Sequence, residues 1–251
     1  MLKPIRIVAS VVLFWPFVCS AQNTSLASGH WEGTAATPGR SIKLVVDLSQ
    51  NENGQSFGSM SFPDQKTSGM TLSGITIDGN SVAFKSPVTP EFKGTIAPDG
   101  QSMTGTIQLA ANTRRVQLQR ISKPDLGSIA HSSAITKQLE GTWEGALTYR
   151  KTWGDMTPPE GNTPQGATFG LRVQFSTGTE QLGRGQLSRL DEPGAVFPID
   201  VVHQDGNAIR FEFFSVAGVF DGQLNGSEIS GEWRQLGSDP IPVTFKRVSG
   251  S

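Results

Sequence analysis

An internal repeat is the feature that most constrains the fold, because it divides the chain into two similar parts. Three segments recur in the same order: GHWEG (29–33) as GTWEG (141–145), DGNSVAF (78–84) as DGNAIRF (205–211), and VQLQR (116–120) as VTFKR (243–247). From the glycine of the second segment to the arginine of the third, both copies span 41 positions (79 to 120 and 206 to 247). Three ordered matches with one spacing predict tandem domains rather than a single large one.

The repeat also sets the expected domain boundaries. We expect the first repeat to occupy residues 22–121 and the second to occupy residues 139–251. The segment between them, 122–138, is rich in Ser, Ala and Ile, contains Pro124 and lacks the alternation of a strand. This composition favours a linker. A short helix over 128–139 that caps one domain is the alternative.

Apolar and polar residues alternate with a period of two through both repeats, which is typical of half-buried strands. Leu44, Val46 and Leu48, for example, share one side of a segment, and Lys43 and Asp47 lie on its other side. Dipeptides that favour tight hairpin turns separate such segments. They are Asn53-Gly54, Asp78-Gly79, Asp99-Gly100, Asp205-Gly206 and Asn225-Gly226. The 29 Gly and 15 Pro residues fit a fold with many turns and little helix.

The alternation indicates about eight short strands in each repeat. In the first repeat they centre near Trp31, Val46, Met60, Ile75, Phe84, Gly94, Ile107 and Leu118. Consecutive hairpins form an antiparallel meander, and such a meander can close into an up-and-down barrel that leaves no exposed sheet edge. The sequence therefore predicts an all-β chain of two tandem antiparallel up-and-down β-barrels. An open roll of seven or eight strands per repeat is the alternative.

Each repeat carries G-x-W on its first strand and an arginine on its last, which pairs Trp31 with Arg120 and Trp143 with Arg247. This pattern resembles the lipocalin and fatty-acid-binding barrels, together called calycins. The resemblance implies that the tryptophan packs under the barrel floor while the arginine lies across its ring in a cation–π contact. The repeats are also similar to the small G-x-W-x-G β-module that precedes hydrolase domains in secreted bacterial proteins. We identify no hydrolase domain in this chain, so this likeness implies no catalytic residue.

The first 21 residues have the pattern of a secretory signal peptide. Lys3 and Arg6 precede an apolar run over 7–18, and small residues stand before an expected cleavage site after Ala21. The run is too short to span a bilayer, which needs about 20 apolar residues. A lipoprotein signal would have a small residue directly before Cys19, where this chain has valine. We therefore expect a periplasmic or secreted protein without a lipid anchor.

Composition and motif spacing exclude several classes of protein. Lys and Arg number 21 against 22 Asp and Glu, so no basic excess exists to bind the phosphates of a nucleic acid. A single cysteine excludes a disulfide framework, and three histidines without metal-ligand spacing give no metal site. Residues 54–58 read G-x-S-x-G, but the pentad follows an Asn-Gly turn into a strand instead of forming a strand–turn–helix elbow. We expect no catalytic residue, no metal and no cofactor, and hence no enzyme.

The second repeat contains about 15 more residues than the first between its tryptophan and its Asp-Gly turn (143 to 206 against 31 to 79). They lie over 150–166 and join the first two expected strands, a loop that the calycin resemblance places over the cavity mouth. Long loops on rigid scaffolds often carry function. The side chains expected to contact a ligand or a partner are Tyr149, Trp153, Met156 and Phe169. Capping of the barrel interior by the same loop is the alternative.

The sequence gives conflicting indications of which barrel holds a cavity. Candidate interior residues of the second repeat are bulky: Phe211, Phe213, Phe220 and Trp233. Those of the first are smaller: Ile75, Val82, Ile96, Met103 and Ile107. Size therefore favours a cavity in the first barrel, and the long loop favours the second.

Taken together, these features predict an exported, non-catalytic binding or accessory protein. Its partner would be a small apolar molecule or a secreted protein, and its oligomeric state is left open. One alternative is an inhibitor or accessory subunit of a secreted hydrolase, and a third is an enzyme built at a barrel mouth.

Overall fold

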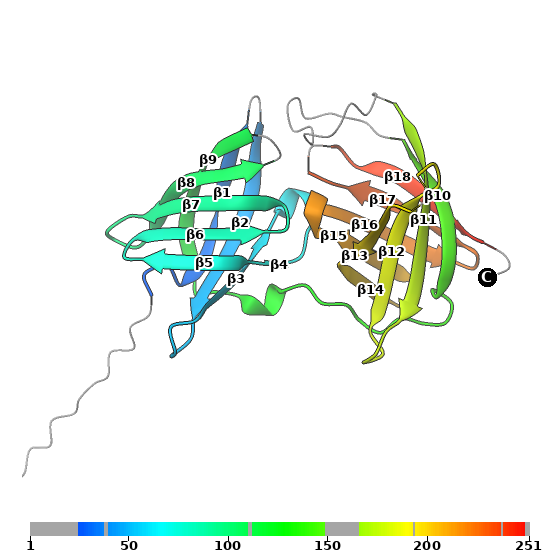
Figure 1. Ribbon diagram of the computed structural model, residues 1–251, viewed down its shortest axis with the longest axis horizontal. Coiled ribbons are helices and arrows are strands. Elements are labelled where there is room, and N and C mark those ends of the chain that lie inside the picture. The colour runs from blue at the N-terminus through cyan, green and yellow to red at the C-terminus, as the bar shows by residue number, and fades with distance from the viewer. Residues whose placement is uncertain are drawn as a thin grey trace, which may run out of the picture.

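The computed structural model describes residues 25–37, 40–109, 112–148, 166–192, 194–236 and 238–248. Over those ranges the chain is all-β, and its helical content is limited to short 3-10 helices. No helix there is long and apolar enough to cross a membrane. Two nine-stranded antiparallel sheets follow one another along the chain and form two tandem, nearly closed barrels (Figure 1). The predicted fold class is confirmed.

The strands follow the chain in a simple meander. The first barrel consists of β1 (Gly29–Thr37), β2 (Arg40–Gln50), β3 (Ser56–Ser61), β4 (Met70–Thr71), β5 (Ser73–Asp78), β6 (Ser81–Ser86), β7 (Thr89–Ile96), β8 (Ser102–Leu109) and β9 (Asn112–Ser122). The second consists of β10 (Gly141–Thr148), β11 (Thr168–Thr177), β12 (Gly183–Arg189), β13 (Val196–Ile199), β14 (Val201–Asp205), β15 (Ala208–Phe213), β16 (Gly218–Asn225), β17 (Glu228–Arg234) and β18 (Ile241–Arg247). The first strand of each barrel pairs with the last, β1 with β9 and β10 with β18.

Each barrel has one strand more than the eight expected, and the extra strand marks where the sheet opens. All eight expected positions of the first repeat lie in strands, and the ninth strand is the two-residue β4. Only Leu72 separates β4 from β5, and only Asp200 separates β13 from β14. β4 and β5 are the two edge strands of the first sheet, and β13 and β14 are those of the second. The chain therefore passes from one edge to the other within one residue, and no ladder of hydrogen bonds closes the gap there.

Each barrel encloses its own apolar cluster, because alternate residues of its strands point inward. In the first barrel, the rings of Phe84 and Phe92 stack with their centroids 4.3 Å apart. In the second, Phe211 stacks on Phe220 at 4.7 Å. Full burial of one such side chain contributes roughly 1.5–3 kcal/mol. The two repeats thus use the same aromatic pair to join the same two neighbouring strands, β6 with β7 and β15 with β16.

The linker between the barrels is extended and hydrogen-bonded to both. Its 3-10 helix η2 (Leu126–Ser128) is followed by chain without helix, so the helix considered over 128–139 is absent. Gly69 of the first barrel exchanges two backbone hydrogen bonds with the linker, each 3.0 Å long. Gly183 of the second barrel donates its N–H to the carbonyl of Ser133 at 2.7 Å. The linker therefore packs as an additional extended segment along both barrels.

A short segment of the second barrel completes the core of the first. It consists of the 3-10 helix η3 (Phe214–Val216) and the residue after it, Ala217. Ala217 is fully buried within the apolar cluster of the first barrel, and Phe214 and Leu236 pack against that cluster. The two barrels therefore share an apolar contact, which lies directly after β15.

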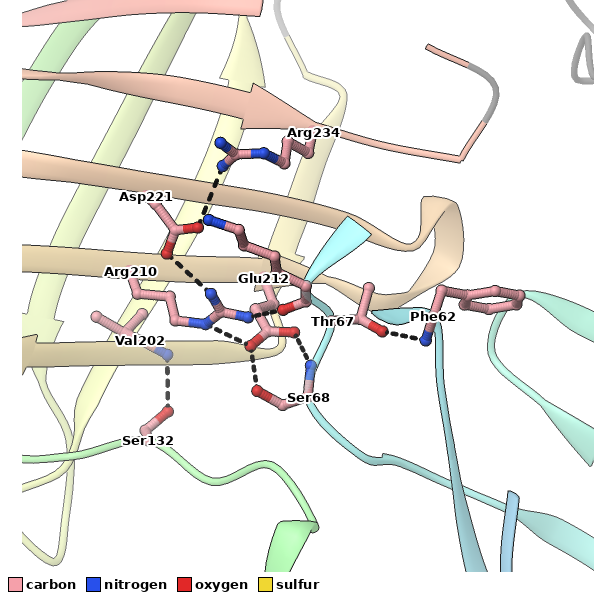
Figure 2. A network of polar contacts seen from close by, with 10 residues as sticks. Phe62, Thr67, Ser68, Ser132, Val202, Arg210, Glu212, Asp221 and Arg234 are labelled. Atoms are coloured by element: carbon pink, nitrogen blue, oxygen red, sulfur yellow. Dashed lines mark hydrogen bonds and ion pairs between the residues drawn. The ribbon is translucent and has the colours of Figure 1, made fainter. Parts of the chain in front are cut away.

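A polar network beside this contact holds the same two barrels together (Figure 2). Glu212 of β15 is fully buried, and its carboxylate accepts hydrogen bonds from Ser68 N at 2.9 Å and Ser68 Oγ at 2.5 Å. Arg210 Nε donates to the same carboxylate at 2.9 Å. The guanidinium of Arg210 also bonds Asp221 Oδ1 at 2.8 Å and the carbonyl of Lys66. The buried charge is thus fully provided with partners, as a stable interior requires.

Candidate ligand-binding pocket

The second barrel contains an apolar pocket of about 280 Å³. Strands β10 to β13 and β15 to β18 supply its wall, together with η3 and the residue after β17. The lining residues are Leu147, Leu171, Leu187, Phe197, Phe211, Phe213, Ser215, Val216, Phe220, Trp233, Gln235, Val243 and Phe245. Because nearly every strand of the barrel contributes, the pocket lies in the barrel interior. Leu147 stands one residue before β10 ends, which places the pocket toward the end of the barrel where β10 leads on to β11.

One wall of the pocket is a set of packed aromatic rings. Phe213 meets the indole of Trp233 edge to face at 5.7 Å, and Phe220 meets Phe245 in the same manner at 5.5 Å. Phe211 lies among them, stacked on Phe220. Such offset and edge-on arrangements are the preferred geometries of aromatic pairs. The rings are therefore held by one another, and their faces and edges present a preformed apolar surface.

This arrangement explains why bulk does not fill the second barrel. The large rings stack against one another along one wall and leave the space facing Leu147, Leu171 and Leu187 open. In the first barrel, smaller side chains such as Ile42 and Leu109 are completely buried in a continuous cluster that also includes Ala217 of the second barrel. The pocket of the second barrel agrees with the indication from the long loop, whereas the size argument took no account of the ring geometry.

Two lining residues carry polar groups that are free for a ligand. Trp233 Nε1 donates to Gln235 Oε1 at 2.8 Å, which leaves the Nε2 amino group of Gln235 as a donor. Within the described part of the chain, neither Gln235 Nε2 nor Ser215 Oγ forms a hydrogen bond with protein. Of the described lining residues none is Asp, Glu, Lys, Arg or His. The described lining therefore offers hydrogen bonds but no charge.

A paired charge lies just outside the pocket, on the same inner face of the barrel. Arg189 is directly opposite Leu171 in the β11–β12 ladder, so both side chains point to the same side of the sheet. Its guanidinium stands 4.4 Å over the ring of Phe169 and forms ion pairs with Asp191 at 2.6 Å and Glu192 at 3.2 Å. The hydrogen bond with Asp191 raises the pKa of Arg189 above its usual value. The rim thus carries a cation that two carboxylates already neutralise.

Of the four residues expected to bind a ligand or a partner, one lies in the described chain. Phe169 pairs with Leu147, a lining residue, and stands two positions before Leu171 on the same face of β11. It therefore belongs to the rim and not to the wall. Tyr149, Trp153 and Met156 lie outside the described residues, and their contacts stay a prediction. The loop that contains them joins β10 to β11, as the repeat comparison indicated.

The Trp–Arg pairs lie at the far end of each barrel. Arg120 Cζ is 4.6 Å from the ring centroid of Trp31, and Arg247 Cζ is 4.2 Å from that of Trp143. Both tryptophans are completely buried and donate their indole N–H to a backbone carbonyl four residues earlier, at 2.9 Å in the first barrel and 2.8 Å in the second. Each arginine bonds two further carbonyls of the segment before the first strand. The pairs therefore close the barrel floors, and Arg120 Nε is the one buried polar side-chain atom of the two pairs that has no hydrogen-bond partner in the described chain.

Gln235 is the polar residue of the pocket that the sequence analysis missed. In the first barrel Phe92 pairs with Ile107, and in the second Phe220 pairs with Trp233, so these two pairs are equivalent. Two residues further on, at the same inward position, the first repeat has Leu109 and the second has Gln235. A polar residue that replaces a buried leucine between the repeats was a usable signal. It required the strand register, because the two copies differ in loop length before this point.

Comparisons with known proteins assign no family to the chain. No protein-family model matches it, and no curated protein matches it. One similar solved structure is a "putative outer membrane protein" from Bacteroides fragilis, with 12% sequence identity over 88% of this chain and 97% of that chain and a TM-score of 0.26. Another is a protein with unknown function from the DUF3598 family, from Nostoc punctiforme, with 13% identity over 89% and 97% and a TM-score of 0.25. Likenesses of this size carry no argument about what the chain binds.

Proposed function

We propose that the chain is an exported, non-catalytic binding protein whose second barrel holds a small apolar molecule. The observation that carries the proposal is the apolar pocket of about 280 Å³ inside that barrel. Ligand sites are typically concave and mostly apolar, with a few polar groups that orient the ligand, and about 300 Å³ is the low end of their usual size. The pocket has each of these properties. The ligand that fits it is therefore small.

The uncharged lining that the described residues form supports a binding role rather than catalysis. General acid–base or nucleophilic chemistry needs a titratable or activated side chain at the reacting atoms, and the described lining residues include none that is charged. The motif serine, Ser56, begins β3 and not a strand–turn–helix elbow. The three-residue cluster of His30 with Asp47 and Glu32 joins β1 to β2 at the first barrel, away from the pocket.

Two further parts of the proposal have separate support. The calycin-like character is supported by the two Trp–Arg contacts, at 4.6 and 4.2 Å, which the resemblance implied. Export is supported by the sequence of residues 1–21, which lies outside the described residues.

The binding proposal is tested by filling the pocket. Val216 lines the mouth and is 38% exposed, so Val216→Trp adds bulk where the fold tolerates it. The variant should bind the neutral fluorescent dye N-phenyl-1-naphthylamine about tenfold more weakly than the wild type, a loss of about 1.4 kcal/mol. Ile121→Trp is the matched control, because Ile121 is 58% exposed on the first barrel and far from the lining residues. Equal dye binding by the two variants would show that the dye uses another site.

A second candidate is an accessory subunit or inhibitor of a secreted hydrolase. It is favoured by the edge strand β13, which exposes Val196 (52%) and Phe197 (48%) and pairs on one side only, with β12. Phe197 lines the pocket, whereas its neighbour Val196 points to the opposite face. Val196→Glu should therefore leave dye binding unchanged if the ligand proposal holds. Crosslinking in the producing cell that captures a hydrolase, and loses it in Val196→Glu, would favour this second candidate instead.

A further inference from the structure

The pocket presents hydrogen-bond donors without a charge, and this combination restricts its ligand. Gln235 Oε1 accepts the indole N–H of Trp233, at 2.8 Å. Because an indole nitrogen only donates, it fixes the orientation of the amide and leaves Gln235 Nε2 as the group offered to the pocket. Ser215 provides a hydroxyl at the mouth. A molecule that fills the pocket without accepting from Nε2 displaces water and leaves this donor unpaired, which is unfavourable.

A carboxylate is a poor match for the same pocket. No described lining residue is a cation, and an ion transferred from water into apolar surroundings loses hydration that only a partner charge restores. Arg189, at the rim, is already paired with Asp191 and Glu192. An anion near this guanidinium therefore also approaches two negative charges.

The shape of the wall indicates the body of the ligand. The rings of Phe211, Phe213 and Trp233 present edges and faces with centroid separations of 5.7 and 6.1 Å, the range in which a further aromatic ring packs favourably. Gln235 and Ser215 lie at the mouth end, whereas Phe211 and Phe220 lie deeper in the buried cluster. A ring system would therefore enter first, with its polar group last.

We propose that this pocket selects neutral, ring-containing apolar molecules that carry one hydrogen-bond acceptor, such as a ketone or ester oxygen, and that Gln235 determines this selectivity. The inference rests on the proposed function and specifies its ligand class. Leu109, at the equivalent inward position of the first barrel, shows that the fold itself does not need an amide there.

Three compounds with one ring system test the selectivity by calorimetric titration: naphthalene, 2-acetylnaphthalene and 2-naphthoate. The wild type should bind the ketone roughly fivefold more tightly than naphthalene, the effect of one net hydrogen bond, and should bind naphthoate most weakly. Gln235→Leu copies the first barrel and should remove the preference for the ketone. Gln235→Glu keeps an acceptor for Trp233 Nε1 but loses the donor, so it should remove the preference even if the leucine variant is poorly folded.

The outcomes separate the two proposals. If the wild type binds neither the naphthylamine dye nor any of the three compounds, the binding function itself is wrong. If the dye binds but the wild type and both Gln235 variants rank the compounds alike, the selectivity inference is overturned and the binding function stands. Tighter binding of naphthoate than of the ketone would also overturn the inference. A ketone preference that both variants lose supports it.

Discussion

His30 shows how one side chain can connect local electrostatics with the stability of the first barrel. Its Nδ1 lies 2.8 Å from Oδ1 of the almost fully buried Asp47, and its Nε2 lies 3.1 Å from Glu32 Oε1. Asp47 Oδ1 also accepts from the N–H of Asp125 in the linker, at 2.6 Å. Partial burial lowers the pKa of His30, but the hydrogen bonds and charges of Asp47 and Glu32 outweigh it and raise the pKa above 6.5.

A raised pKa in the folded state gives a stability contribution with a defined pH dependence. The contribution is complete below the unfolded pKa of about 6.5 and is lost as the pH rises through the folded pKa. We expect the melting temperature of the wild type to exceed that of His30→Gln at pH 5.5 and the difference to shrink by pH 8.5. His131→Gln is the control, because within the described residues the ring of the exposed His131 forms one hydrogen bond, to the carbonyl of Ile129, and no ion pair. A constant difference across this pH range would contradict the prediction.

At the same scale, the sequence identified the Trp–Arg pairs but not the partners of His30. A tryptophan and an arginine on paired first and last strands are visible from the repeat, because both copies keep them. His30 has no counterpart in the second repeat, where Thr142 stands. Asp47 looks like any outward-facing strand residue until the linker folds back over it. Contacts that depend on a non-repeated segment are therefore hidden from repeat analysis.

At the scale of elements, each barrel places two glycines opposite each other on neighbouring strands. Gly94 pairs with Gly105 between β7 and β8, and Gly222 pairs with Gly231 between β16 and β17. A Cβ built on Gly231 would lie 2.2 Å from the carbonyl oxygen of Asp221 and 2.5 Å from the Cα of Gly222. These distances are too short for any side chain, so the glycine pair permits the close approach of the two strands.

We therefore expect Gly231→Ala to destabilise the protein by about 1–3 kcal/mol, the usual cost of overpacking. Urea unfolding followed by tryptophan fluorescence measures this loss. Gly127→Ala, in the linker, is the matched control, because the nearest atom to its added Cβ is a side-chain oxygen at 3.3 Å. If the two variants unfold at the same urea concentration, the strands are free to move apart and the close packing is not required.

The alternation pattern predicted the eight long strands of the first repeat but not the gap in each barrel. A two-residue strand such as β4 is too short to show any period, and the break at Asp200 is a single residue. The position of the cavity was also beyond the pattern, because it depends on how Phe211 and Phe220 stack, not on which residues point inward. Periodicity therefore gives the elements, whereas side-chain geometry decides whether their interior is full.

At the scale of the whole molecule, the two barrels are joined by contacts that only one repeat provides. Arg210 and Glu212 of the second repeat correspond to Ala83 and Lys85 of the first. These positions directly precede and directly follow the phenylalanine that ends the shared DGN-x-x-x-F segment. Glu212 is fully buried against Ser68 of the other barrel. The asymmetry between otherwise similar repeats thus coincides with the interface. The segment at this interface contacts both the pocket and the core of the first barrel. Ser215 and Val216 of η3 line the pocket, and Ala217, the residue after η3, is buried in the first core.

Because the interface combines a buried carboxylate with an apolar contact, we expect the barrels to unfold together. Removal of one partner from a buried ion pair costs about 3–5 kcal/mol, so Glu212→Ala should leave Arg210 Nε and the Ser68 amide without their acceptor and uncouple the barrels. Scanning calorimetry should then show one transition for the wild type and two for the variant. Glu232→Ala is the control, since Glu232 is an exposed carboxylate that pairs with Arg234 on the same strand, β17, and forms no ion pair with the first barrel among the described residues. A single transition for Glu212→Ala at the wild-type temperature would mean that the carboxylate is not needed and that the remaining contacts, the burial of Ala217 and the bond from Arg210 to the carbonyl of Lys66, couple the barrels.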